Sequence, residues 1–179
     1  ASRVPLPHLG SHRTRHLSQA FDEVRGRYVE MFREWVDDYE ADGVCIVFCR
    51  SWPYVLYEQP VLESFQRQNG VDMRDLDPFD ERVLAHRATF LTQLPRKTRQ
   101  MLDEVGHMLD EVGQKRGRRL RTAYVIPAED YSASSSPDLG PFTPLLIHAM
   151  DVETWVEEGL VDDLVVHIQN VGDAAGKEE

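Results

Sequence analysis

The sequence predicts an α/β fold of parallel strands with flanking helices, and three observations support this prediction. Residues 43–49 are seven consecutive uncharged residues, rich in β-branched and aromatic types, which is typical of a buried parallel strand. An amphipathic helical pattern comes directly before this run. Two more strand-like segments, at 121–126 and 163–168, each follow a helical segment. We therefore expect three parallel strands that are neighbours in one sheet.

The first helix and the first strand form a continuous αβ unit. From residue 17 to 39, apolar residues recur at spacings of three and four, and Asp42-Gly43 then ends the helix and begins the strand. The strand's alternation places Val44, Ile46, Phe48 and Arg50 on one face, and Cys45, Val47 and Cys49 on the other. We expect both faces to be covered and both cysteines to fill the core.

A long excursion follows Pro53. It contains a helix at 60–69 that Gly70 ends, a turn at 72–78 and a helix at 79–91, and its length is typical of a lid or substrate loop. Another helix is predicted at 94–116, with the repeat Met-Leu-Asp-Glu-Val-Gly at 101 and 108. We interpret the resulting stripe of Met101, Val105, Met108 and Val112 as core contact rather than a binding groove.

The last third of the chain contains the other two strands. The strand at 121–126 ends at Pro127, and a loop rich in Ser, Pro and Gly extends to residue 144. Asp151 is expected to cap a helix that Gly159 ends, before the third strand. The domain organisation is then a connector at 1–16, one α/β domain at 17–169 and a polar tail at 170–179.

Composition excludes several classes of function. The 179 residues include 20 Lys and Arg against 31 Asp and Glu, for a net charge of -11, which disfavours binding to nucleic acid or to an anionic membrane. No apolar run reaches the roughly 20 residues of a membrane-spanning helix, and no signal peptide is visible. The histidines and cysteines lack the spacing of a metal site, and no phosphate loop or dinucleotide fingerprint is present, so we expect no metal or cofactor.

Four short motifs, within a match from about 17 to 166, resemble a known family. They are Tyr39-Glu40-Ala41-Asp42-Gly43-Val44, Phe48-Cys49-Arg50, Gly70-Val71-Asp72 and Asp151-Val152-Glu153-Thr154-Trp155. In these motifs the chain resembles glycosyl hydrolase-like family 10, the glycoside-hydrolase-like (β/α)8-barrel (TIM-barrel) proteins of planctomycete-type bacteria. The resemblance implies carbohydrate as the ligand. A complete barrel typically needs about 250 residues, so we expect a partial (β/α)8 barrel.

The candidate site consists of residues that follow the first two strands, because such barrels carry their chemistry at the carboxyl ends of the strands. The candidate catalytic acids are Glu58, Glu129 and Asp130, and the candidate ligand-binding residues are Arg50, Trp52, Tyr54 and Tyr57.

Each candidate also has a structural alternative. A glycosidase needs two carboxyl groups, here Glu58 with either of the other acids, but acids on solvated loops are common. The aromatic rings could stack on a sugar or pack beneath the excursion. Arg50 could orient a ligand or form an ion pair with a neighbouring strand.

One departure from the family pattern bears on catalysis. Val47 stands where the family usually has an Asp, and valine can neither donate nor accept a proton. The resemblance thus implies a protein that acts on or binds carbohydrate at the mouth of a barrel. The alternative is a barrel that binds carbohydrate without catalysis or is purely structural. The oligomeric state and the compartment do not follow from the sequence.

Overall fold

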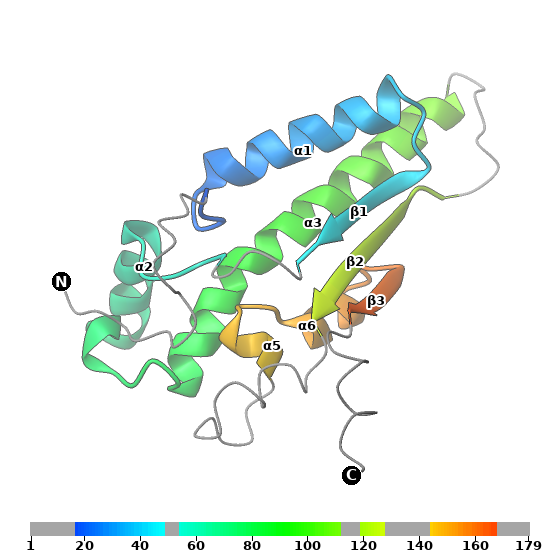
Figure 1. Ribbon diagram of the computed structural model, residues 1–179. Coiled ribbons are helices and arrows are strands. Elements are labelled where there is room, and N and C mark those ends of the chain that lie inside the picture. Colours follow the sequence, from blue (N-terminus) through cyan, green and yellow to red (C-terminus); the bar gives the residue numbers. More distant parts are fainter. Residues whose placement is uncertain (1–16, 49–53, 112–118, 128–143, 168–179) are drawn as a thin grey trace, which may run out of the picture.

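Three parallel strands form one open sheet in the computed structural model, which describes residues 17–48, 54–111, 119–127 and 144–167 (Figure 1). The strands are β1 (Gly43–Val47), β2 (Arg121–Pro127) and β3 (Asp163–His167), in the order β1-β2-β3. In the register, Gly43 lies opposite Arg121 and Ala123 lies opposite Asp163. The predicted parallel α/β sheet is confirmed, and the described strands form an open sheet rather than a closed barrel.

The helices precede and connect these strands. They are α1 (Asp22–Asp37), α2 (Gln59–Asn69), the 3₁₀ turn η1 (Met73–Asp75), α3 (Glu81–Glu111), α5 (Pro144–Ile147) and α6 (Val152–Glu157). Gly70 ends α2 in the left-handed conformation, with φ of 73°. The Asp151 carboxylate caps α6 by accepting the Thr154 N–H at 3.1 Å. Both helix boundaries were predicted from the sequence.

The two helices predicted at 79–91 and 94–116 are a single helix in the structure. α3 runs through Pro95, although proline removes a backbone hydrogen bond from a helix interior. Leu91 and Leu94 before this proline, and Met101 and Leu102 after it, are all buried. This continuous buried stripe packs against α1 and the sheet, which offsets the loss. Within the predicted methionine stripe, Met101 and Val105 are buried but Met108 is exposed.

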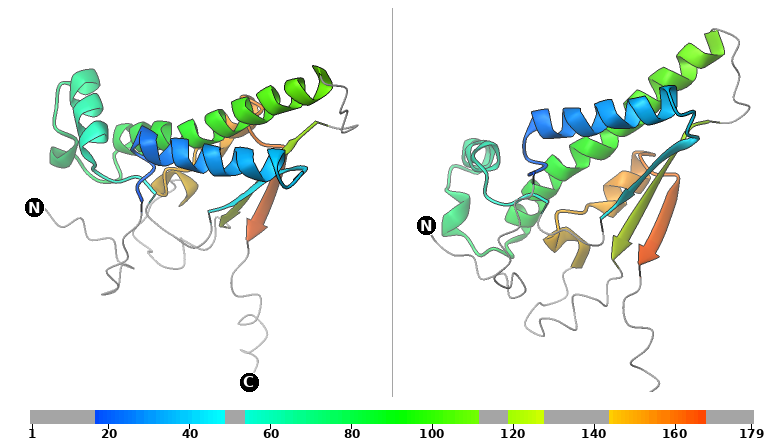
Figure 2. Two further views of the ribbon diagram at one scale, coloured as in Figure 1. Left: turned by 90° about the horizontal axis from the view of Figure 1, so that it is seen from above. Right: turned by 45° about the horizontal axis from the view of Figure 1, so that its top comes forward.

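One face of the sheet is covered by helices. α1 and α3 pack side by side over it, as Figure 2 shows, and α6 contributes Trp155. The Phe48 ring, just after β1, lies 5.9 Å from the Tyr124 ring and 5.6 Å from the Trp155 ring. The Trp155 indole N–H donates to Thr92 Oγ1 at 2.9 Å, which connects α6 to α3. This aromatic cluster is the centre of the hydrophobic core.

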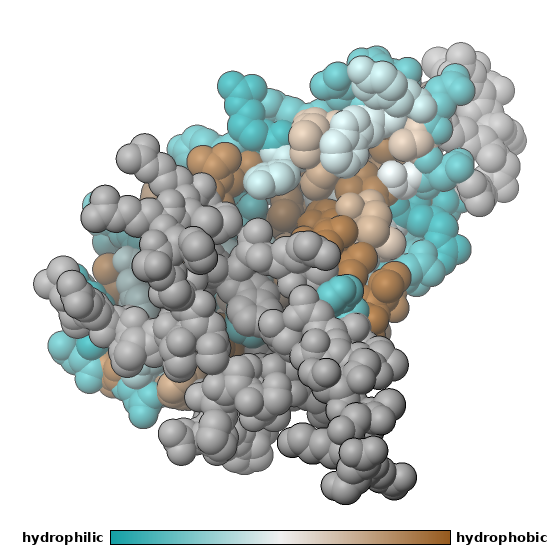
Figure 3. All heavy atoms as spheres, in the orientation of Figure 1, coloured by the Kyte–Doolittle hydropathy of each residue, from teal (hydrophilic) through white to brown (hydrophobic). Residues whose placement is uncertain are grey.

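No described helix covers the opposite face of the sheet, here called the bare face (Figure 2). Val47 is 54% exposed and Val165 is 49% exposed, and apolar side chains gather over the strands on this face in Figure 3. The expectation that both faces of the first strand are covered is therefore wrong. Cys45 is exposed on the bare face instead of filling the core, and Cys49 lies outside the described residues. The physical reason is that α1, α3 and α6 all pack on the same side.

Gly43 permits the close pairing of β1 with β2. A Cβ atom at this position would overlap the carbonyl oxygen of Arg121. The Arg121 N–H donates to the Asp42 carbonyl at 3.0 Å at the same place. The Asp-Gly pair therefore starts β1 and also sets how closely the two strands approach each other.

Candidate functional site

The predicted site residues divide between described and undescribed segments. Tyr54, Tyr57 and Glu58 belong to the segment that leads from β1 into α2, here called the 54–58 loop. The others lie outside the described residues; they are Arg50, Trp52, Glu129 and Asp130.

The 54–58 loop is fixed by hydrogen bonds from distant parts of the chain. The Gln19 N–H donates to the Tyr54 carbonyl at 2.9 Å. The Arg87 guanidinium, on α3, donates from Nε and Nη2 to the Val55 carbonyl at 3.0 and 2.6 Å. Two consecutive carbonyl groups of the loop are therefore bound by two separate elements, which gives the loop one backbone conformation.

Glu58 has a structural task in this loop. It occupies the position before the first residue of α2, and its Oε2 accepts the Leu56 N–H at 2.7 Å. One carboxylate oxygen is thereby used to close the turn. The two acids predicted to pair with Glu58 lie outside the described residues.

The two tyrosines of the loop differ in their surroundings. The Tyr54 ring meets the Phe48 ring edge-on, with 5.1 Å between centroids, so it extends the aromatic cluster of the core. The Tyr57 side chain is half-buried, and this burial raises the pKa of its hydroxyl. Tyr57 therefore presents a neutral hydroxyl and a partly accessible ring at neutral pH.

Two further side chains belong to the candidate site, Arg87 and His148, and neither was predicted from the sequence. Burial lowers the pKa of the Arg87 guanidinium, and the nearby Tyr57 and Glu58 only partly oppose this. Burial, followed by the positive charge of Arg87, lowers the pKa of His148 to about 4. His148 is therefore neutral at pH 7. The only sequence signal for Arg87 is a charged residue within the buried stripe of α3.

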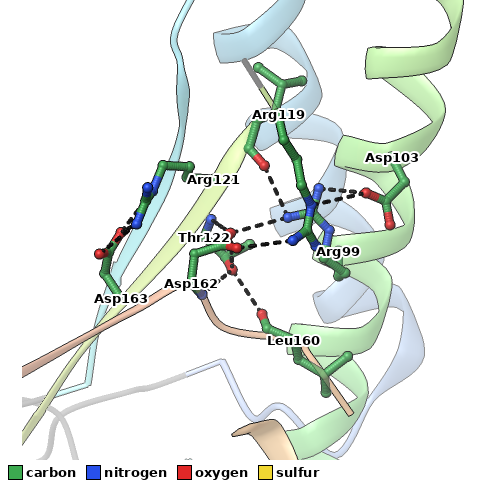
Figure 4. Close-up of polar contacts among 9 residues, drawn as sticks. Arg99, Asp103, Arg119, Arg121, Thr122, Leu160, Asp162 and Asp163 are labelled. Carbon is green, nitrogen blue, oxygen red and sulfur yellow. Dashed lines mark hydrogen bonds and ion pairs between the residues drawn. The ribbon is translucent and has the colours of Figure 1, made fainter.

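The largest polar cluster among the described residues lies at the other end of the sheet, where β2 and β3 begin (Figure 4). The Asp162 carboxylate accepts the Thr122 N–H at 2.8 Å, Arg119 Nη1 at 3.1 Å and Arg99 Nη1 at 3.3 Å. Arg99 also donates to Asp103 at 2.6 Å and to the Leu120 carbonyl at 3.0 Å.

This cluster connects α3 to the starts of β2 and β3. The Thr122 hydroxyl donates to the Leu160 carbonyl at 2.9 Å, and Arg121 forms a two-pronged ion pair with Asp163. In parallel α/β folds, groups at the amino ends of the strands contribute stability, whereas ligands bind at the carboxyl ends. We therefore interpret the cluster as structural.

A serine–histidine pair joins α2 to α3, and its geometry argues against nucleophilic catalysis. Ser64 Oγ lies 2.8 Å from His86 Nε2 and also donates to the Val61 carbonyl at 3.1 Å. The direction of the Ser64–His86 bond follows from the histidine tautomer: when the hydroxyl gives its single proton to the Val61 carbonyl, the imidazole N–H is the donor to Ser64. The pair therefore packs the two helices together rather than activating a serine.

Within the described residues, no group of three or more His, Cys, Asp or Glu is placed to hold a metal ion. No helix in that part of the chain is both long enough and apolar enough to cross a bilayer. No model of a known protein family matches the chain, and no curated protein matches it significantly.

Proposed function

We propose that this chain is a section of a (β/α)8 barrel that binds carbohydrate at the carboxyl end of its strands and does not hydrolyse it. The sheet supports the barrel proposal, because its strands follow one another in sequence order and the helices of the described residues lie on one face only (Figure 2). Doubly wound sheets carry helices on both faces, whereas barrel strands turn one face inward. The bare face carries Val47, Val125 and Val165, and branched residues of this type fill barrel interiors.

The observation that carries the binding proposal is the anchored 54–58 loop. Its backbone is held by Gln19 and Arg87, so Tyr57, in the loop that follows β1, can bind a ligand without a large ordering cost. Aromatic side chains beside a few polar groups are typical of small-molecule sites. Tyr57 and His148, each of which interacts electrostatically with Arg87, supply the groups of such a combination.

The proposal that the chain does not hydrolyse the carbohydrate is based on its candidate acidic residues. Glycosidases need two carboxyl groups about 5 to 10 Å apart, one of which must give up a proton. Glu58 uses one carboxylate oxygen to close its own turn, and Val47 takes the place of the family's acid. Of the three predicted acids, the described residues contain Glu58 alone, and its carboxylate has a structural role, so we infer binding without cleavage.

The test is calorimetric titration of the whole chain with neutral and acidic oligosaccharides. We expect binding that Tyr57→Ala weakens about tenfold, the loss of one aromatic contact. Tyr39→Ala is the matched control, because Tyr39 is 71% exposed and lies before β1, at the other end of the sheet.

Three results would contradict the proposal. The first is that no saccharide binds, and the second is that the two tyrosine variants lose affinity equally. The third is hydrolysis of aryl glycosides that Glu58→Gln abolishes, which would restore a catalytic role to that acid.

A further inference from the structure

Arg87 differs from the other buried arginines of the described residues. The other two are Arg25 and Arg99. Arg25 forms an ion pair with Asp22, and Arg99 forms ion pairs with Asp103 and Asp162. No carboxylate in the described part of the chain lies within ion-pair distance of Arg87, which is only 6% exposed. A charge removed from water is costly unless it is paired, so this guanidinium requires an explanation.

The hydrogen bonds of Arg87 leave part of the guanidinium unused. An arginine has five N–H donors, and the Val55 carbonyl accepts one from Nε and one from Nη2. The other three donors have no acceptor among the described residues. Two of these are on Nη1 and one is on Nη2, so they form the end of the guanidinium that matches the two oxygens of a carboxylate.

The neighbours of Arg87 do not neutralise it. His148 is uncharged at pH 7, and Tyr57 keeps its proton. The negative charge of Glu58 acts on Arg87, but burial outweighs it and leaves the pKa of the guanidinium lowered. An anionic group bound at the unused donors would therefore be favoured, with the neutral Tyr57 hydroxyl as an additional hydrogen-bonding group.

We propose that Arg87 binds a carboxylate on the ligand, so that the carbohydrate taken at the 54–58 loop is an acidic sugar of the uronic acid class. This inference rests on the proposed function, because it names the kind of carbohydrate that the same site binds. The net charge of the chain, -11, repels anions, so a preference for an acidic saccharide would arise locally at Arg87.

The test compares two oligosaccharides of equal length, one built from glucose and one from glucuronate, by calorimetric titration of the whole chain. We expect the glucuronate oligosaccharide to bind the unmodified protein at least about tenfold more tightly, the size of one charge-assisted hydrogen bond. Arg87→Lys keeps the charge but loses the planar fork, and Arg87→Met loses both. Each should abolish most of the preference. Because Arg87 also holds the 54–58 loop through the Val55 carbonyl, both affinities should fall, so the readout is the ratio of the two affinities.

Controls separate this inference from folding effects and from the proposed function. Arg121→Lys alters an arginine that is ion-paired with Asp163 at the other end of the sheet, and it should keep the preference. If circular dichroism shows that Arg87→Met does not fold, Arg87→Lys decides the question. Equal affinity of the unmodified protein for both saccharides, or a preference that survives Arg87→Lys, would overturn the acidic ligand but leave carbohydrate binding intact. Failure of both saccharides to bind would overturn the proposed function as well.

Discussion

Replacing Gly43 with alanine should strongly destabilise the fold, because β1 and β2 meet at this residue. The added methyl group would overlap the Arg121 carbonyl oxygen, and the three nearest atoms are all backbone atoms of Arg121, which cannot rotate away. Separating the strands would also weaken the Arg121 N–H bond to the Asp42 carbonyl. Overpacking costs about 2 kcal/mol and the weakened hydrogen bond about 1 kcal/mol, so we expect a loss of about 3 kcal/mol.

Urea unfolding followed by circular dichroism measures this loss, which corresponds to a fall in Tm of about 9 °C for a chain of this size. Gly26→Ala is the matched control. Gly26 lies inside α1, where a Cβ atom would meet nothing within 4 Å, so alanine should stabilise the protein by about 0.5 to 1 kcal/mol. If Gly43→Ala unfolds within about 0.5 kcal/mol of the unmodified chain, the close approach of the two strands is not as described.

Two further predictions concern charged groups. Asp162→Ala should lower the free energy of unfolding, measured in urea, by about 3 kcal/mol, because it removes an ion-pair partner of the buried Arg99. Asp163→Ala breaks an exposed ion pair and should lower it by less than about 1 kcal/mol. Equal losses would contradict a structural role for the cluster. The folded-state pKa of His148, about 4, lies below the ordinary 6.5, so the unfolded state binds the proton more readily. The free energy of unfolding should therefore have its full value above pH 6.5 and fall by up to about 3 kcal/mol as the pH decreases to 4. His148→Gln should remove most of this pH dependence.

The sequence predicted the elements whose signals are local. The three strands, the end of α2 at Gly70 and the cap at Asp151 each depend on a few neighbouring residues, and each is present in the structure. The continuity of α3 through Pro95 was missed, because proline is a local signal that the buried stripe on both sides overrides. Tertiary packing decided that element.

Long-range features were not accessible from the sequence in the same way. A run such as residues 43–49 has the same pattern whether one face or both are covered, so the exposure of Cys45 and Val47 could not be foreseen. The loop tyrosines and Glu58 were named as site candidates from their position after a strand. Arg87 was not, because its importance depends on the Val55 carbonyl that it binds and on a carboxylate that it lacks.

The pairing of Gly43 with Arg121 also has a consequence for synthesis on the ribosome. All of α2 and α3 must be translated between β1 and its first partner strand. At about 5 to 20 residues per second, this delay is on the order of ten seconds. During that interval β1 has two unpaired edges, and its apolar side chains can pair with a neighbouring nascent chain. The long α3 can form early from local contacts, so we expect α1 and β1 to pack against α3 before β2 has been synthesised.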